Sequence, residues 1–117
     1  MTGQLRTTVR EAEGAVLIGL FGELDLSEVD QVREVLDAAE AKQPQVLVID
    51  LRGLEFMDSS GIRLVVEADI RAKGDGRRLL LVRGPEPVHR VFTIALLDRR
   101  LEFVDEPPTE VPDEPDA

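Results

Sequence analysis

The sequence contains no cysteine, and this absence excludes several kinds of chemistry at once. Disulfide bonds, thiol catalysis and zinc–thiolate sites all require that residue. His89 is the only histidine, so a metal centre built on histidines is excluded as well. Tryptophan and tyrosine are also missing, which removes most of the aromatic surface on which bases or sugars stack. We therefore expect neither a metal nor a cofactor.

Basic residues are scarce relative to acidic ones. The chain has 14 lysines and arginines against 24 aspartates and glutamates, a formal net charge of −10. Residues 105–117 hold six of these acids and four prolines but no basic residue, so residues 1–104 are only mildly acidic. We predict one folded domain over 1–104 and an acidic, proline-rich, disordered tail over 105–117. A mildly acidic domain lacks the basic face that nucleic-acid binding needs.

Long hydrophobic runs are missing too. No apolar segment approaches the ~20 residues of a membrane span, and the N-terminus lacks the pattern of a signal peptide. We therefore expect a cytoplasmic protein without a membrane partner. With 117 residues, 43% of them hydrophobic, the chain is long enough for one globular domain with one core.

Segments with the pattern of strands and helices alternate along the chain. Strands are predicted at residues 5–10, 15–22, 46–51, 78–83 and 101–104. Helices are predicted from Ser27, as its N-terminal cap, to just before Pro44, and over about 60–73 and 88–97. Strands separated by helices favour parallel neighbours joined by right-handed crossovers. The predicted fold is α/β, with one mixed, mostly parallel sheet and the helices packed mainly on one face.

The segment Asp58-Ser59-Ser60-Gly61 lies at the junction between the predicted strand 46–51, a turn, and the helix that follows. Apolar residues at 62, 65, 66 and 70 mark the expected buried face of that helix. A serine at a helix start can cap unpaired backbone N–H groups, or it can receive a phosphoryl group that the helix dipole stabilises. We predict that Ser60 caps the helix and that Ser59 is the exposed hydroxyl.

A second polar junction follows the predicted strand 15–22. In a parallel sheet the segments after neighbouring strands meet at one edge, so we expect Asp25 and Ser27 near Ser59. A metal or acid–base site made of Glu23, Asp25 and Asp58 is disfavoured because no other ligand cluster supports it.

A hydrolytic triad of Asp58, Ser59 and His89 is also disfavoured. The chain has no G-x-S-x-G motif, and the histidine lies in a helical segment of its own. We predict that the protein is not an enzyme.

Four segments carry a resemblance to a known family. They are Phe-Gly-Glu-Leu-Asp at 21–25, Val-Ile-Asp-Leu at 48–51, Phe-Met-Asp-Ser-Ser-Gly at 56–61, and Val-His-Arg-Val-Phe at 88–92 followed by Leu-Leu at 96–97. In this order and spacing they resemble the bacterial anti-sigma factor antagonists of the STAS domain family, over about residues 5–104.

The resemblance implies a partner-switching protein. Its unphosphorylated form would bind an anti-sigma factor that is also an ATP-dependent serine kinase, and would thereby release the sigma factor. The kinase would phosphorylate the serine that follows the aspartate, here Ser59, and a phosphatase would reset the cycle. The alternative is a constitutive STAS scaffold, or a subunit of a signalling complex, that binds its partner without phosphorylation.

The expected partner surface gathers the polar residues of both junctions. It comprises Asp25, Ser27, Asp58, Ser59, Ser60, Gly61 and Arg63. Gly61 is expected to let a partner backbone approach closely. Arg63 stands where many family members have glycine, which indicates an altered choice of partner.

Overall fold

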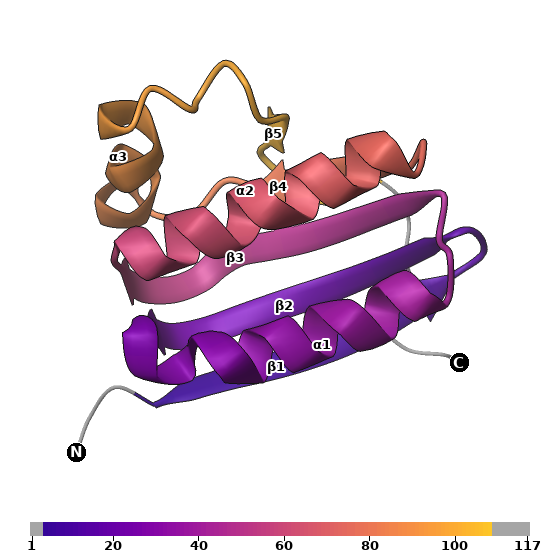
Figure 1. Cartoon of the computed structure of the whole chain (residues 1–117). Coiled ribbons are helices and arrows are strands. Elements are labelled where there is room, and N and C mark those ends of the chain that lie inside the picture. Colours follow the sequence, from indigo (N-terminus) through magenta and orange to yellow (C-terminus); the bar gives the residue numbers. More distant parts are fainter. Residues whose placement is uncertain (1–3, 109–117) are drawn as a thin grey trace.

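In the part of the chain that the structure describes, five strands form one sheet and are accompanied by three helices (Figure 1). The computed structural model describes residues 4–108. The strands are β1 (Leu5–Ala12), β2 (Ala15–Leu24), β3 (Val46–Met57), β4 (Arg78–Val82) and β5 (Phe103–Val104). The helices are α1 (Val29–Ala41), α2 (Ser59–Gly74) and α3 (Glu86–Ile94), and a single 3-10 turn, η1 (Leu26–Glu28), precedes α1. The element order agrees with the one predicted from the sequence.

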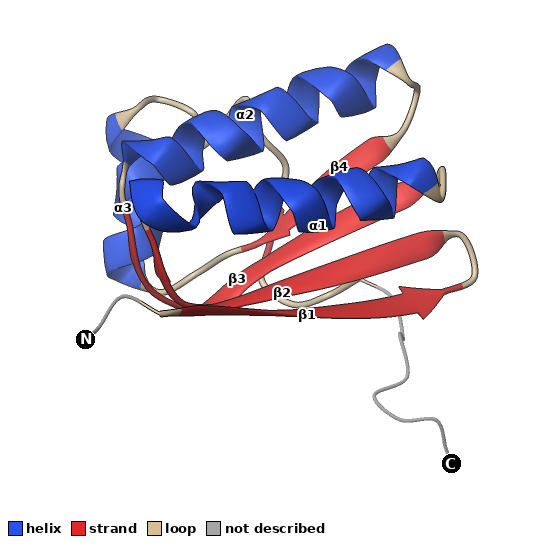
Figure 2. Cartoon of the chain, turned by 60° about the horizontal axis from the view of Figure 1, so that its bottom comes forward, coloured by secondary structure: helices blue, strands red, loops and turns tan. Residues whose placement is uncertain are grey.

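The sheet follows chain order, β1-β2-β3-β4-β5. Only β1 and β2 pair antiparallel, through the turn at Glu13 and Gly14, and the other three pairings are parallel. Figure 2 shows the helices together on one side of the sheet. The predicted class, a mixed and mostly parallel sheet with its helices on one face, is therefore confirmed.

The main core lies between the helices and the sheet. From α1 it takes Val29, Val32, Leu36 and Ala39, the buried face expected from the sequence. Helix α3 contributes Val88 and Phe92. Pro87 lies in the first turn of α3, where its missing N–H costs no hydrogen bond.

The buried face of α2 differs from the predicted one. Ile70 is 64% exposed, so its assignment to the core was wrong. The buried residues are smaller on average: Gly61, Leu64, Val65, Ala68 and Ala72. Glycine and alanine let the helix lie close to the sheet and to α1, a geometry that a pattern of large apolar residues does not reveal.

Strand β3 is twice as long as predicted. The expected turn after Leu51 is absent, and the strand continues to Met57 with Leu54 buried. Its second half pairs with β2 through two register shifts. Gly53 permits this, because a Cβ there would lie 2.3 Å from the Phe21 ring. The extension carries the chain directly from the sheet into α2.

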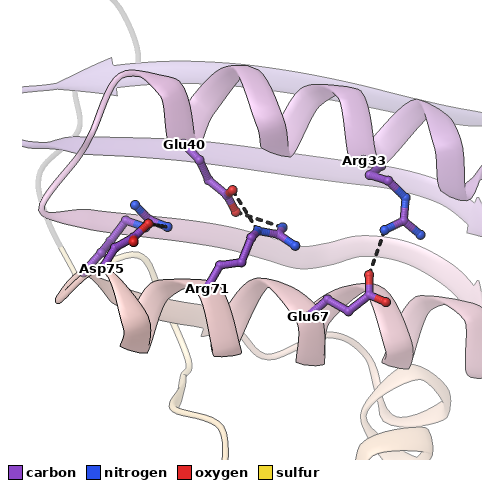
Figure 3. Close-up of polar contacts among 6 residues, drawn as sticks. Arg33, Glu40, Glu67, Arg71 and Asp75 are labelled. Carbon is purple, nitrogen blue, oxygen red and sulfur yellow. Dashed lines mark hydrogen bonds and ion pairs between the residues drawn. The ribbon is translucent and has the colours of Figure 1, made fainter.

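Two ion pairs join α1 to α2 across the top of the core (Figure 3). The Arg33 guanidinium lies 2.7 Å from the Glu67 carboxylate. Arg71 binds both carboxylate oxygens of Glu40, at 2.9 and 3.0 Å. The two crossover helices are thus held side by side by charged contacts in addition to their apolar ones.

Candidate functional site

The ends of β2 and β3 bring the two polar junctions together. The residues Leu24 and Met57 are partners in the register, and the Asp58 N–H donates a hydrogen bond to the Leu24 carbonyl at 3.2 Å. The chain after β2 therefore passes beside the first turn of α2. This places Asp25 and Ser27 in the segment that neighbours Ser59.

Aspartates, not serines, cap both helical starts. The Asp58 carboxylate accepts a hydrogen bond from the Ser60 N–H at 2.9 Å, and α2 begins at Ser59. The prediction that Ser60 caps this helix was therefore wrong. A carboxylate is the stronger acceptor and is also attracted by the positive end of the helix dipole.

Before α1, too, the cap is an aspartate and not the predicted serine. The Asp25 carboxylate accepts hydrogen bonds from the N–H of Ser27 at 3.0 Å and from its hydroxyl at 2.7 Å. Ser27 was expected to cap the helix, and it lies instead inside the turn η1. The turn was not foreseen, because its three residues carry no separate signal in the sequence.

The members of the predicted partner surface differ in exposure. Ser59, Ser27 and Arg63 are exposed, whereas Asp25, Asp58 and Ser60 are half-buried. Gly61 is buried, and a Cβ there would lie 2.5 Å from Cγ of Met57. The missing side chain of Gly61 thus lets α2 pack closely against Met57 of β3, and contact of Gly61 with a partner stays a prediction.

A crevice of about 170 Å³ lies at the start of α2. It is lined by Leu26, Val29, Arg33, Ser59, Ser60 and Arg63. Three of these residues, Leu26, Val29 and Arg33, do not belong to the partner surface predicted from the sequence. Leu26 is 77% exposed, a large apolar side chain that carries no pattern apart from standing between polar neighbours. Arg33 belongs to another helix, and only the packing of α1 on α2 brings it here.

Positive charge dominates the crevice. Arg33 donates to Glu67, and this hydrogen bond, aided by the charges of Arg71 and Arg63, lowers the pKa of the Glu67 carboxyl. Two guanidinium groups therefore lie near Ser59, and one of them is partly neutralised by a carboxylate. Guanidinium groups and a helix N-terminus are the surroundings that stabilise a phosphate.

The alternatives of a hydrolytic or metal site find no support among residues 4–108. His89 stacks edge-on against Phe103, with ring centroids 4.8 Å apart, and burial together with Arg83 lowers its pKa. In that part of the chain no cluster of three histidine or carboxylate residues could hold a metal ion. No helix there is long and apolar enough to cross a membrane.

Comparison with known proteins identifies the family. The pattern of the STAS domain matches residues 6–108. The chain belongs to the STAS domain family. An anti-sigma F factor antagonist of Lysinibacillus sphaericus is 37% identical to this STAS domain over 90 residues, which are 76% of this chain and 74% of that protein.

Solved structures share the fold of this STAS domain. An anti-sigma factor antagonist from Mycobacterium paratuberculosis gives a TM-score of 0.82 at 23% identity, over 92% of this chain and 89% of that one, a likeness of fold alone. The structure of unphosphorylated SpoIIAA has a TM-score of 0.74 and 27% sequence identity. The match covers 86% of this chain and 90% of that one. The phosphorylated form of SpoIIAA, a Bacillus cell fate determinant, has a TM-score of 0.68 and 26% sequence identity. The match covers 86% of this chain and 93% of that one.

Proposed function

We propose that this STAS domain is an anti-sigma factor antagonist whose binding is switched off by phosphorylation of Ser59. The unphosphorylated form binds an anti-sigma factor that is also a serine kinase, and this binding frees the sigma factor. A phosphatase restores the binding form. The observation that carries the proposal is the exposed hydroxyl of Ser59 at the first residue of α2, beside a crevice that a partner can reach.

The relatives support the proposal at two levels. A protein of 37% identity is named an anti-sigma F factor antagonist. SpoIIAA, at 26–27% identity, has been solved both without and with phosphate. In this proposal, the phosphate is added within the Asp-Ser-Ser-Gly segment at 58–61, on Ser59.

The surroundings of Ser59 support a switch that changes binding but spares the fold. A phosphoryl group adds about −1.5 to −2 charges. Within the protein, the start of α2 and the arginines Arg33 and Arg63 offset that charge. A partner packed on the neutral hydroxyl and on exposed Leu26 would instead meet a bulky dianion beside Asp58.

The test is a phosphorylation assay with the anti-sigma factor/serine kinase and ATP, read by tandem mass spectrometry. Phosphate is expected on Ser59 in the wild type and in Ser60→Ala, and Ser59→Ala should stay unmodified while still binding the kinase. Phosphate on Ser60 in Ser59→Ala, at the wild-type rate, would show that the wrong hydroxyl is assigned. Binding that is equally tight before and after phosphorylation would favour the constitutive scaffold.

A further inference from the structure

Helix α2 carries a row of polar side chains along the side that faces α1. Ser59, Arg63, Glu67 and Arg71 follow one another at intervals of four residues, which places them on one side of the helix. The last two members of the row are bound to charged side chains of α1 (Figure 3). The row therefore follows the seam between the two helices, and Ser59 stands at its beginning.

Arg63 is the charged member of this row that lacks a partner. Within residues 4–108 its side chain makes no hydrogen bond and no ion pair. Its charge helps to lower the pKa of the Glu67 carboxyl, but the hydrogen bond from Arg33 is the main cause of that shift. Arg63 is exposed, so its guanidinium is available to an anion that comes near.

The place that Arg63 can reach is the one occupied by Ser59. Arg63 lies one helical turn after Ser59, and both line the crevice at the start of α2. Side chains of a helix lean toward its N-terminus, so the Arg63 guanidinium extends back over the preceding turn. A phosphoryl group on Ser59 would create a pair of opposite charges four residues apart. The order, anion before cation along the helix, is the more favourable of the two.

Arg33 reaches the same crevice from α1 and has donors to spare. Glu67 accepts a hydrogen bond from one terminal nitrogen of the guanidinium, Nη1, at 2.7 Å. Figure 3 shows the other terminal nitrogen pointing away from Glu67. A guanidinium group carries five N–H donors, so it can bind a second anion while it keeps the first. Glu67 thus holds Arg33 beside the crevice without exhausting it.

Two carboxylates near the crevice oppose a further anion. Asp58 accepts a hydrogen bond from the Ser60 N–H, and Asp25 accepts two from the N–H and the hydroxyl of Ser27. These donors offset only part of the negative charge. A phosphate on Ser59 therefore needs cations of its own, and the two arginines that line the crevice supply them.

We propose that Arg63 and Arg33 clamp the phosphoryl group of Ser59 in the crevice. The inference rests on the proposed phosphorylation and adds what the new charge binds. The row then alternates between anion and cation at successive turns of α2, and its unpaired member gains a partner. Arg63 also belongs to the expected partner surface, so the phosphate withdraws from the kinase a cation that the kinase would contact.

The test uses phosphoserine placed at position 59 during translation, so no kinase is needed. Phosphorus-31 NMR follows the second ionisation of the phosphate as the pH rises. Arg63→Gln should raise the midpoint by about 0.2–0.5 pH unit, because loss of a nearby cation disfavours the dianion. Arg33→Gln should raise it as well. Lys73→Gln removes an equal charge about 20 Å along α2 and should leave the midpoint unchanged.

Urea unfolding of the phosphorylated and unmodified chains gives a second measurement and shows that each variant folds. Phosphorylation should stabilise the chain more when Arg63 is present than in Arg63→Gln, and Lys73→Gln should not change that gain. An unchanged phosphate midpoint in either arginine variant would overturn the paired clamp, even where the kinase phosphorylates Ser59. A raised midpoint in both variants, with no phosphorylation by the kinase, would support the clamp and contradict only the proposed function.

Discussion

In the proposed switch, the phosphoryl charge and the contact with the partner both involve Ser59. Ser59→Asp should weaken binding to the anti-sigma factor/serine kinase while thermal stability changes little, because a carboxylate at a helix start is favoured by about 0.3–1 kcal/mol. Titration calorimetry measures the affinity, since the chain has no tryptophan or tyrosine to report it. Thr93→Asp on α3 serves as the control. Equal affinity of Ser59→Asp and wild type would contradict the switch.

The residue that caps α2 is Asp58, and the free energy of unfolding should show it. Asp58→Ala should lower that free energy by about 0.5–2 kcal/mol, because the Ser60 N–H loses its acceptor. Ser60→Ala should cost much less, since its hydroxyl is not the cap. Urea unfolding followed by circular dichroism measures both variants. A larger loss in Ser60→Ala than in Asp58→Ala would reverse the assignment.

Leu96 follows α3 in a conformation that suits glycine. Its φ is +62° and its side chain is 78% exposed. Leu96→Gly should raise the free energy of unfolding by about 1 kcal/mol, because a left-handed backbone costs a residue with a Cβ about 1–2 kcal/mol. Leu96→Ala is the matched control, because it removes the apolar surface but keeps the Cβ. If glycine and alanine stabilise equally, backbone strain is not the reason.

At the scale of elements, order and type could be predicted because they follow from local patterns. Most of these elements carry an apolar run or an apolar periodicity of their own, and α1 buries Val32 and Leu36 as expected. Boundaries were less predictable. The length of β3 depends on its pairing with β2, and the exposure of Ile70 depends on how closely α2 lies against the sheet. These are tertiary effects, and no short segment carries them.

In the candidate site, too, the residues that follow from a local motif could be predicted, and those that depend on tertiary packing could not. Ser59 and Asp58 could be found because they are adjacent in one motif. Arg33 could not, since it comes from α1 and reaches the crevice only through helix packing. Leu26 was missed for a different reason, because a lone exposed leucine in a loop is a common feature of protein surfaces.

The pairing of α1 with α2 should depend on pH through Glu67. Its folded-state pKa is lowered, so the carboxylate stabilises the fold above its ordinary pKa of 4.5, and this stabilisation is lost as the pH falls through the lower folded value. Glu67→Gln should therefore lose less stability than wild type between neutral and acidic pH. Urea midpoints across this range measure it, with Glu34→Gln on α1 as control. Parallel curves for Glu67→Gln and wild type would contradict the prediction.

At the scale of the whole molecule, partner binding and the tail should be separable. Arg63→Glu should weaken binding to the kinase by more than the ~0.2–1 kcal/mol of an exposed ion pair, because repulsion replaces attraction at a desolvated contact. Deletion of 109–117 should leave the affinity nearly unchanged. Titration calorimetry measures the affinity of each variant for the kinase. If Arg63→Glu binds the kinase with normal affinity while deletion of 109–117 weakens binding, the interface lies elsewhere.

The hydrogen bond from Asp58 to Leu24 has a consequence for newly made chains. It forms only after β2 and β3 have paired, and parallel strands separated by a helix must meet by closing a long loop, which is slower than closing the β1–β2 hairpin. We therefore expect the Ser59 region to be assembled late during folding. Under the proposed switch, an unfinished chain would therefore neither bind the kinase nor be phosphorylated by it.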